Sequence, residues 1–244
     1  MNSNNLKNKA FSGMIWKFME RICAQVVSLI VSIVLARILM PDDYSIVSIV
    51  TIFFTFCNVF ISGGLNTALI QKKDADVEDY STVLHTSMFV ALILYMVMFF
   101  LAPSIANLYS KQILIPVIRI MSLTFFINVF KSVLSAYTSS NLQFKKFFFS
   151  TIVGTIISAF VGIYMAINGY GAWALVAQQM TNSLLDTLIL YLTTKYRIIF
   201  KVSFKKLKSL FSYGWKIFVS SIISVIYDQI NPLIVGVKYT SKDL

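Results

Sequence analysis

Long apolar runs separated by short polar breaks dominate the chain. A helix needs roughly 20 mainly apolar residues to cross the hydrocarbon core of a bilayer. Seven runs meet this requirement, and the sequence therefore predicts an all-α integral membrane protein with about seven transmembrane helices. The predicted spans lie near residues 14–39, 44–69, 82–102, 113–137, 147–168, 172–193 and 210–237.

Short turn signals separate the predicted spans. No charged residue occurs between Phe147 and Leu185, a stretch too long for one span, and the sequence Gly169-Tyr170-Gly171 interrupts it. Glycine pairs of this kind mark turns, so two helices joined by a tight turn are predicted. Pro41, with two aspartates after it, ends the first span and begins the second.

Composition agrees with a membrane protein and excludes an ordinary soluble domain. Hydrophobic residues make up 57% of the chain and charged residues only 13%, against about 45–50% and about 25% in soluble domains. The mean hydropathy is +0.77. Cys23, Cys57 and His85 are the only cysteines and histidine; they predict no disulfide framework, metal site or cofactor.

The net charge of +11 reflects membrane topology rather than nucleic-acid binding, because the bases fall in loops between apolar runs. The base-rich loops alternate along the chain, and cytoplasmic loops are enriched in Lys and Arg. The sequence therefore predicts a cytoplasmic N-terminus. One side receives Lys7, Lys9, Lys72, Lys73, Lys145, Lys146, Lys195, Arg197, Lys201, Lys205, Lys206 and Lys208, and the other receives Arg37 and Lys111.

A short repeat indicates two related halves. The sequence GMIWK (13–17) opens the first span and YGWK (213–216) opens the seventh. Transporters are often built from related halves. We therefore expect a six-helix lobe at 1–193, a basic cytoplasmic linker at 194–209, and the first helix of an incomplete second lobe at 210–244.

Five sequence motifs, in order along the chain, resemble those of a known family. They are ARILMPDDY (36–44), GGLNTALIQ (63–71) with the acidic stretch after it, NLQFKK (141–146), GYGAWALV (169–176) and LFSYG (210–214). The chain resembles the polysaccharide transporters of the multidrug/oligosaccharidyl-lipid/polysaccharide exporter superfamily, the flippases of O-antigen and capsule repeat units.

The resemblance implies two six-helix bundles around a central cavity in the bacterial cytoplasmic (inner) membrane. It implies flipping of an undecaprenyl-pyrophosphate-linked oligosaccharide by alternating access, for lipopolysaccharide O-antigen, capsule or exopolysaccharide synthesis. The implied partners are the lipid-linked oligosaccharide, the bilayer and the polysaccharide polymerase machinery, with no nucleic acid. The short connections leave no room for a folded catalytic domain, so no enzyme activity is expected.

Polar side chains recur every three or four residues in four of the predicted spans, a spacing that places them on one helical face. Because ionisable groups at bilayer depth cost about 2.5–3.5 kcal/mol on insertion scales, such faces are expected to line a wet cavity. The stripes are Arg21, Gln25, Ser28 and Ser32; Thr124, Asn128, Lys131 and Ser135, with Arg119 before them; Gln178, Asn182 and Asp186; and Lys216, Ser220, Ser224 and Asp228.

Cations outnumber anions in these stripes, which favours an anionic cargo. Arg binds pyrophosphate in a bidentate manner and Lys binds it as a point charge, so Arg21, Arg119 and Lys131 are the strongest candidates. Amides, including Gln179, suit sugar hydroxyls. The predicted substrate-binding residues are Arg21, Gln25, Arg119, Asn128, Lys131, Gln178, Asn182 and Lys216, and the predicted coupling-ion residues are Glu20, Asp186 and Asp228.

Other interpretations of the same residues stay open. Lys17 and Arg21 can extend to the headgroups, and polar stripes can serve helix packing. A cation-coupled multidrug exporter of the same superfamily would have an acidic cavity, and an inactive fragment would fit the length. A membrane-embedded sugar polymerase or ligase would need a large outer loop, which the sequence lacks.

Overall fold

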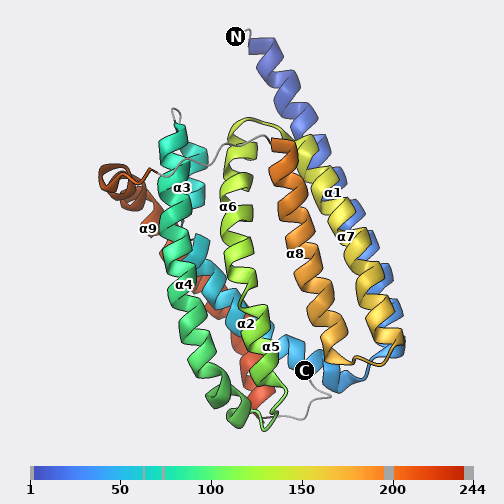
Figure 1. The fold of residues 1–244 in the computed structure, drawn as a ribbon. Coiled ribbons are helices and arrows are strands. Elements are labelled where there is room, and N and C mark those ends of the chain that lie inside the picture. The colour runs from blue at the N-terminus through green and yellow to red at the C-terminus, as the bar shows by residue number, and fades with distance from the viewer. Residues whose placement is uncertain (1–2, 63, 73–74, 195–200, 239–244) are drawn as a thin grey trace.

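A computed structural model describes the backbone of residues 3–62, 64–72, 75–194 and 201–238, and side chains within 11–228 (Figure 1). Nine helices account for nearly all of these residues, and the prediction of an all-α protein is confirmed. The helices are α1 (Ser3–Ile38), α2 (Pro41–Ser62), α3 (Leu65–Gln71), α4 (Val77–Leu108), α5 (Leu114–Met121), α6 (Thr124–Ser140), α7 (Phe144–Ile167), α8 (Ala172–Thr194) and α9 (Phe204–Lys238).

The helices pack as a bundle in which α2 and α9 cross the others. In Figure 1, α1, α7, α8 and α6 follow one another from one edge, and α4 lies at the other edge. Helix α7 packs between α1 and α8, α8 packs on α6, and α2 packs on both α8 and α9. Helix α9 also packs on α3 and α4, so the seventh predicted span lies against the helices that precede it.

Six of the helical segments are long and apolar enough to span a membrane, in the part of the chain that the structure describes. They are Phe11–Ile38, Pro41–Ser62, Val77–Leu108, Leu114–Ser140, Phe144–Ile167 and Phe204–Asp228. The prediction of about seven spans also included α8, which has 23 residues. Two glutamines, an asparagine and Asp186 lower the hydropathy of α8 below that of these six segments, yet α8 lies beside α7 over its length (Figure 1).

Two predicted spans are interrupted. The span predicted at 44–69 divides into α2 and α3 next to Gly64, which has a left-handed backbone (φ 69°). The span predicted at 113–137 divides into α5 and α6 at Ser122 and Leu123. Ser122 Oγ donates to the Ile118 carbonyl (2.7 Å), and hydroxyl groups that bond back to the helix in this way often bend it.

Two predicted boundaries are confirmed. Gly169 and Gly171 both have positive φ, 79° and 55°, in the turn between α7 and α8. Helix α2 begins at Pro41, and Asp43 Oδ2 accepts from the backbone N–H of Met40 (3.1 Å). Local turn and cap chemistry therefore determines these ends. The predicted linker 194–209 is shorter in the structure, because α9 already begins at Phe204.

Base-rich connections gather at one end of the bundle. The N-terminus and the beginnings of α4, α7 and α9 lie toward the same end in Figure 1. Lys72, Lys145, Lys146 and Lys206 lie close to these helix beginnings. The side chains of Lys7, Lys9, Lys73, Lys195 and Arg197 lie outside the described residues.

Candidate functional site

Two connected hollows run between α2, α6, α8 and α9 and share Thr55, Asn58 and Asn128. The smaller has a volume of about 170 Å³ and the larger about 430 Å³. We call them together the polar groove. Its polar lining residues are Thr51, Thr55, Asn58, Ser62, Thr124, Asn128, Ser132, Gln179, Ser183 and Ser221. Among the described residues that line it, none is ionisable.

Asn128 joins three helices at the centre of the groove. Its Nδ2 donates to Asn58 Oδ1 on α2 (3.0 Å), and its Oδ1 accepts from Ser183 Oγ on α8 (3.0 Å). Asn58 Nδ2 in turn donates to the Phe54 carbonyl (2.9 Å). Hydrogen bonds between helices satisfy polar groups that would otherwise be costly at bilayer depth.

Helix α9 continues the polar surface. Ser221 lines both the polar groove and an adjoining hollow of about 490 Å³. Lys216, Ser220 and Ser224 line this adjoining hollow, so three members of the predicted stripe on the seventh span share one surface. Lys216 is thus a cation beside the polar groove.

Lys131 and Asp186 form an ion pair between α6 and α8. Lys131 Nζ lies 2.7 Å from Asp186 Oδ2, and the carboxylate side chain is only 7% exposed whereas the lysine side chain is 42% exposed. Helical spacing predicts Lys131 as a substrate-binding residue and Asp186 as a coupling-ion residue. The structure makes each the counter-ion of the other.

Gln178 and Asn182 face α7 rather than the polar groove. A methyl group on Gly162 would lie 2.9 Å from Gln178 Cβ, and one on Gly154 would lie 3.2 Å from Asn182 Oδ1. The next residues on α8 line the groove instead, because successive helical positions are rotated by about 100°. Gln179 and Ser183 are these groove residues.

The polar stripe predicted on the first span lies away from the groove. Helix α1 packs on α7, and both Arg21 and Gln25 are exposed. Glu20 accepts from Lys17 Nζ (2.7 Å) and from Thr151 Oγ1 (3.3 Å). Glu20 thus has a lysine and a hydroxyl as partners.

Arg119 and Asp228 are also separate from the polar groove. The Arg119 guanidinium lies over the Phe99 ring, 4.1 Å from its centre, which is a cation–π contact between α5 and α4. Asp228 is exposed near the end of the described side chains of α9. Of the predicted substrate-binding residues, the structure therefore brings Asn128 into the groove and Lys216 beside it.

Helix α2 has a polar face that is absent from the predicted stripes. Thr51, Thr55, Asn58 and Ser62 follow one another at steps of four, three and four residues and all line the groove. The same spacing identified the other stripes, but the high hydropathy of α2 concealed it. A search for periodic amides and hydroxyls, without a requirement for charge, would have found these residues.

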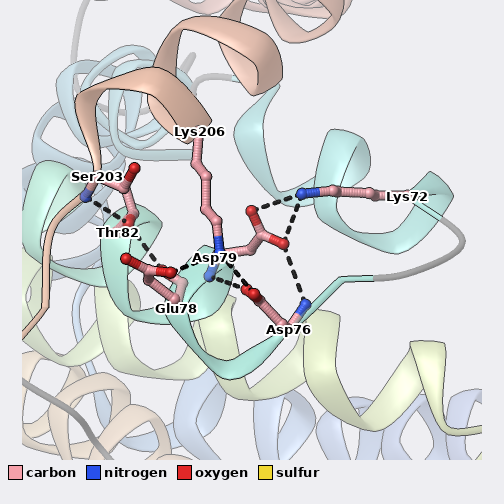
Figure 2. A network of polar contacts seen from close by, with 7 residues as sticks. All are labelled: Lys72, Asp76, Glu78, Asp79, Thr82, Ser203 and Lys206. Atoms are coloured by element: carbon pink, nitrogen blue, oxygen red, sulfur yellow. Dashed lines mark hydrogen bonds and ion pairs between the residues drawn. The ribbon is translucent and has the colours of Figure 1, made fainter.

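A second polar network joins the beginnings of α4 and α9 (Figure 2). Asp76 and Asp79 form a capping box at the N-terminus of α4, and buried Asp79 pairs with Lys72 Nζ (2.6 Å). Lys206 of α9 pairs with Asp76 (2.5 Å) and Glu78 (2.7 Å). The network therefore links the beginning of α9 to the beginning of α4.

The hydrogen bond from Lys206, with smaller contributions from Asp79, lowers the pKa of Asp76 to about 2. Just before α9, the Ser203 backbone N–H donates to Thr82 Oγ1 (3.1 Å) (Figure 2). The carboxylates of this network are matched by lysines.

In the part of the chain that the structure describes, no three His, Cys, Asp or Glu side chains are placed to hold a metal ion.

These features define a multi-span helical membrane protein with a neutral polar groove inside the bundle. A profile of the family described as "polysaccharide biosynthesis protein" matches residues 34–244, and the chain belongs to this family. It is thus a multi-span membrane protein of the polysaccharide biosynthesis family.

Individual relatives agree with the family. The succinoglycan biosynthesis transport protein ExoT of Rhizobium meliloti is 24% identical over 84% of this chain and 42% of its own length. An uncharacterised membrane protein in the cps region of Klebsiella pneumoniae is 24% identical over 79% of this chain and 40% of its own length. The teichuronic acid biosynthesis protein TuaB of Bacillus subtilis is 21% identical over 95% of this chain and 48% of its own length. The chain spans about half the length of these relatives, and no solved structure matches it.

Proposed function

We propose that this chain forms the first lobe of a transporter that flips a lipid-linked oligosaccharide across the bacterial cytoplasmic membrane. The observation that carries this proposal is the polar groove, because amides and hydroxyls at bilayer depth suit a cargo rich in hydroxyl groups. The printed names of the relatives refer to polysaccharide transport and biosynthesis, which supports the same cargo class.

The base-rich end of the bundle is assigned to the cytoplasm. Lys72, Lys145 and Lys206 lie near this end. Cytoplasmic loops of membrane proteins are enriched in Lys and Arg, which supports this assignment. The N-terminus is therefore cytoplasmic. A lipid-linked glycan made in the cytoplasm would enter from this side.

Lys216 is the cation we assign to the pyrophosphate of the cargo. It lines the hollow that adjoins the polar groove, whereas Lys131 is already neutralised by Asp186. A cation-coupled drug exporter would instead need a free carboxylate in the groove. The described lining residues include no carboxylate, so the groove favours the glycan carrier.

Alternating access would come from movement of α9 relative to α2. These two helices pack on each other, and Ser221 of α9 forms one wall of the groove that Asn58 of α2 also lines. A second lobe that begins with α9 would widen or close the groove as it rocks against the first lobe. The polymerase machinery would receive the flipped glycan at the outer face.

The proposal is tested by expressing the complete reading frame that contains this chain in a bacterium that lacks its own flippase. Rescue of surface polysaccharide is expected. Lys216→Gln should reduce the rescue at least about tenfold at unchanged protein abundance, because it removes the phosphate contact. Lys201→Gln, which removes an exposed lysine outside the groove, is the matched control.

Two results would contradict the proposal. Absence of rescue with several lipid-linked glycans, at normal abundance in the membrane, would exclude the transport function. Equal rescue by both lysine variants would remove the role of Lys216 while leaving the transport function in place.

A further inference from the structure

We propose that the polar groove receives uncharged sugar residues of the cargo, and that the free N–H groups of Asn58 and Asn128 bind their hydroxyls. The inference rests on the proposed function and specifies which part of the cargo the groove recognises. Its starting point is the absence of ionisable side chains from the described lining of the groove.

The amide network has spare hydrogen-bonding capacity. A carboxamide has two N–H donors and one carbonyl acceptor with two lone pairs. Among the residues that the structure describes, the hydrogen bonds of these amides use one N–H of Asn128, donated to Asn58, and one N–H of Asn58, donated to Phe54. Each amide therefore keeps a second N–H for a ligand. A sugar hydroxyl both accepts and donates, so it can replace the water that these groups would otherwise bind.

The network also holds these donors in place. Asn128 Oδ1 accepts from Ser183, and this bond orients the amide plane from the opposite side. Three helices thus determine the direction of the Asn128 donors. A preformed direction reduces the entropy lost on binding.

The neutral lining selects against charged sugars. An acid placed between α2 and α6 would lose its hydration without gaining a cation, which is costly at bilayer depth. Lys131 does not supply that cation, because Asp186 already neutralises it. Lys216 lines the adjoining hollow, where the pyrophosphate is proposed to lie.

The groove offers sugar rings apolar surface as well. Phe54 and Met121 line the smaller hollow, and Val59 and Ile61 line the larger. The C–H faces of a sugar can pack on such groups while the hydroxyls reach the amides. The larger hollow, of about 430 Å³, is within the usual range of about 300–1,000 Å³ for ligand sites.

The test measures binding to the complete protein, purified in lipid nanodiscs. Three probes are compared: undecaprenyl pyrophosphate, the same lipid carrying a neutral trisaccharide, and the same lipid carrying a trisaccharide with one uronic acid. We expect the neutral trisaccharide to strengthen binding about tenfold over the bare lipid, as one or two net hydrogen bonds would. The acidic trisaccharide should give less than a threefold gain.

Asn128→Ala should remove the gain from the neutral trisaccharide, measured against the bare lipid on the same variant. The matched control is Asn168→Ala, because Asn168 is an exposed asparagine at the end of α7 that donates only to the Tyr164 carbonyl of its own helix. This control should keep the whole gain. If Asn128→Ala also loses the bare lipid, Asn58→Ala, which removes the other proposed N–H donor, replaces it as the test.

The outcomes separate the two proposals. If no probe binds the unaltered protein, the proposed function fails. If the bare lipid binds and the neutral trisaccharide adds nothing, or Asn128→Ala keeps the gain, the sugar site is overturned and the function stands. Retention of the full gain by Asn58→Ala would overturn the sugar site likewise. Equal gains from the neutral and acidic trisaccharides would overturn the selection for uncharged sugars.

Discussion

The contact between Gly64 and Gly214 predicts that Gly64→Ala destabilises the protein. Gly64 has φ 69°, and a Cβ atom there would lie 2.1 Å from the carbonyl oxygen of Gly214 in α9. A left-handed backbone costs a non-glycine residue about 1–2 kcal/mol. Overpacking adds about 1–3 kcal/mol, and here the obstructing atom is backbone, so α9 must move. The expected loss of unfolding free energy is about 2–5 kcal/mol.

Gly169→Ala is the matched control. Gly169 also has positive φ, 79°, but an added Cβ would meet nothing within 4 Å. This variant should therefore lose only the backbone cost of about 1–2 kcal/mol. Denaturant unfolding in detergent measures both losses. The difference between the variants isolates the close approach of α9 to the beginning of α3.

Displacement of α9 can be measured independently of stability. The Phe60 and Phe218 rings lie 5.3 Å apart, between α2 and α9. Cysteines at these two positions should form a cross-link less readily when Gly64 is alanine than when Gly169 is alanine. Equal unfolding losses and equal cross-linking in the two variants would refute the reasoning, because the glycine contact would then have no role in seating α9.

Two ionic contacts give further predictions. Lys131→Ala should lower the unfolding free energy by about 2 kcal/mol, less than for a fully buried pair because the lysine is partly exposed. The double variant Lys131→Met with Asp186→Leu should lose less than about 1 kcal/mol, because neither charge is left without its partner. A loss in the double variant equal to the sum of the losses in its two single variants would contradict the ion pair. Lys206→Gln should destabilise the protein at pH 5. This loss should shrink as the pH falls from about 4 to about 2, because the pKa of Asp76 is lowered from 3.8 to about 2 in the unaltered protein. Protonation of Asp76 below that range removes from the unaltered protein the ion pair that the variant already lacks. A thermal-unfolding difference that is the same at pH 2 and pH 5 would contradict this reasoning.

Part of the candidate site could be predicted from residue spacing alone. Asn128 was identified from its three- and four-residue spacing, and it lies at the centre of the groove network. Lys216, Ser220 and Ser224 were predicted to share a face, and they line one hollow. Periodicity succeeds here because it depends only on the geometry of a single helix.

Spacing could not determine which helix each polar face contacts. Gln178 and Asn182 form a regular stripe, but glycines on α7 let α8 approach closely, and the stripe faces those glycines. Rotation by one residue places Gln179 and Ser183 in the groove instead. The orientation of α8 thus depends on small residues in another helix, which the pattern within α8 does not contain.

The chain alone determines its class, its helices and most of their ends. Hydropathy over about 20 residues and turn residues such as Pro41 and Gly169 act locally, so they can be interpreted one segment at a time. The pairing of Lys131 with Asp186, the contact of Gly64 with Gly214 and the neutral groove depend on contacts between segments distant in sequence. Close packing of helices produces these contacts, and that packing depends on side chains from several helices at once.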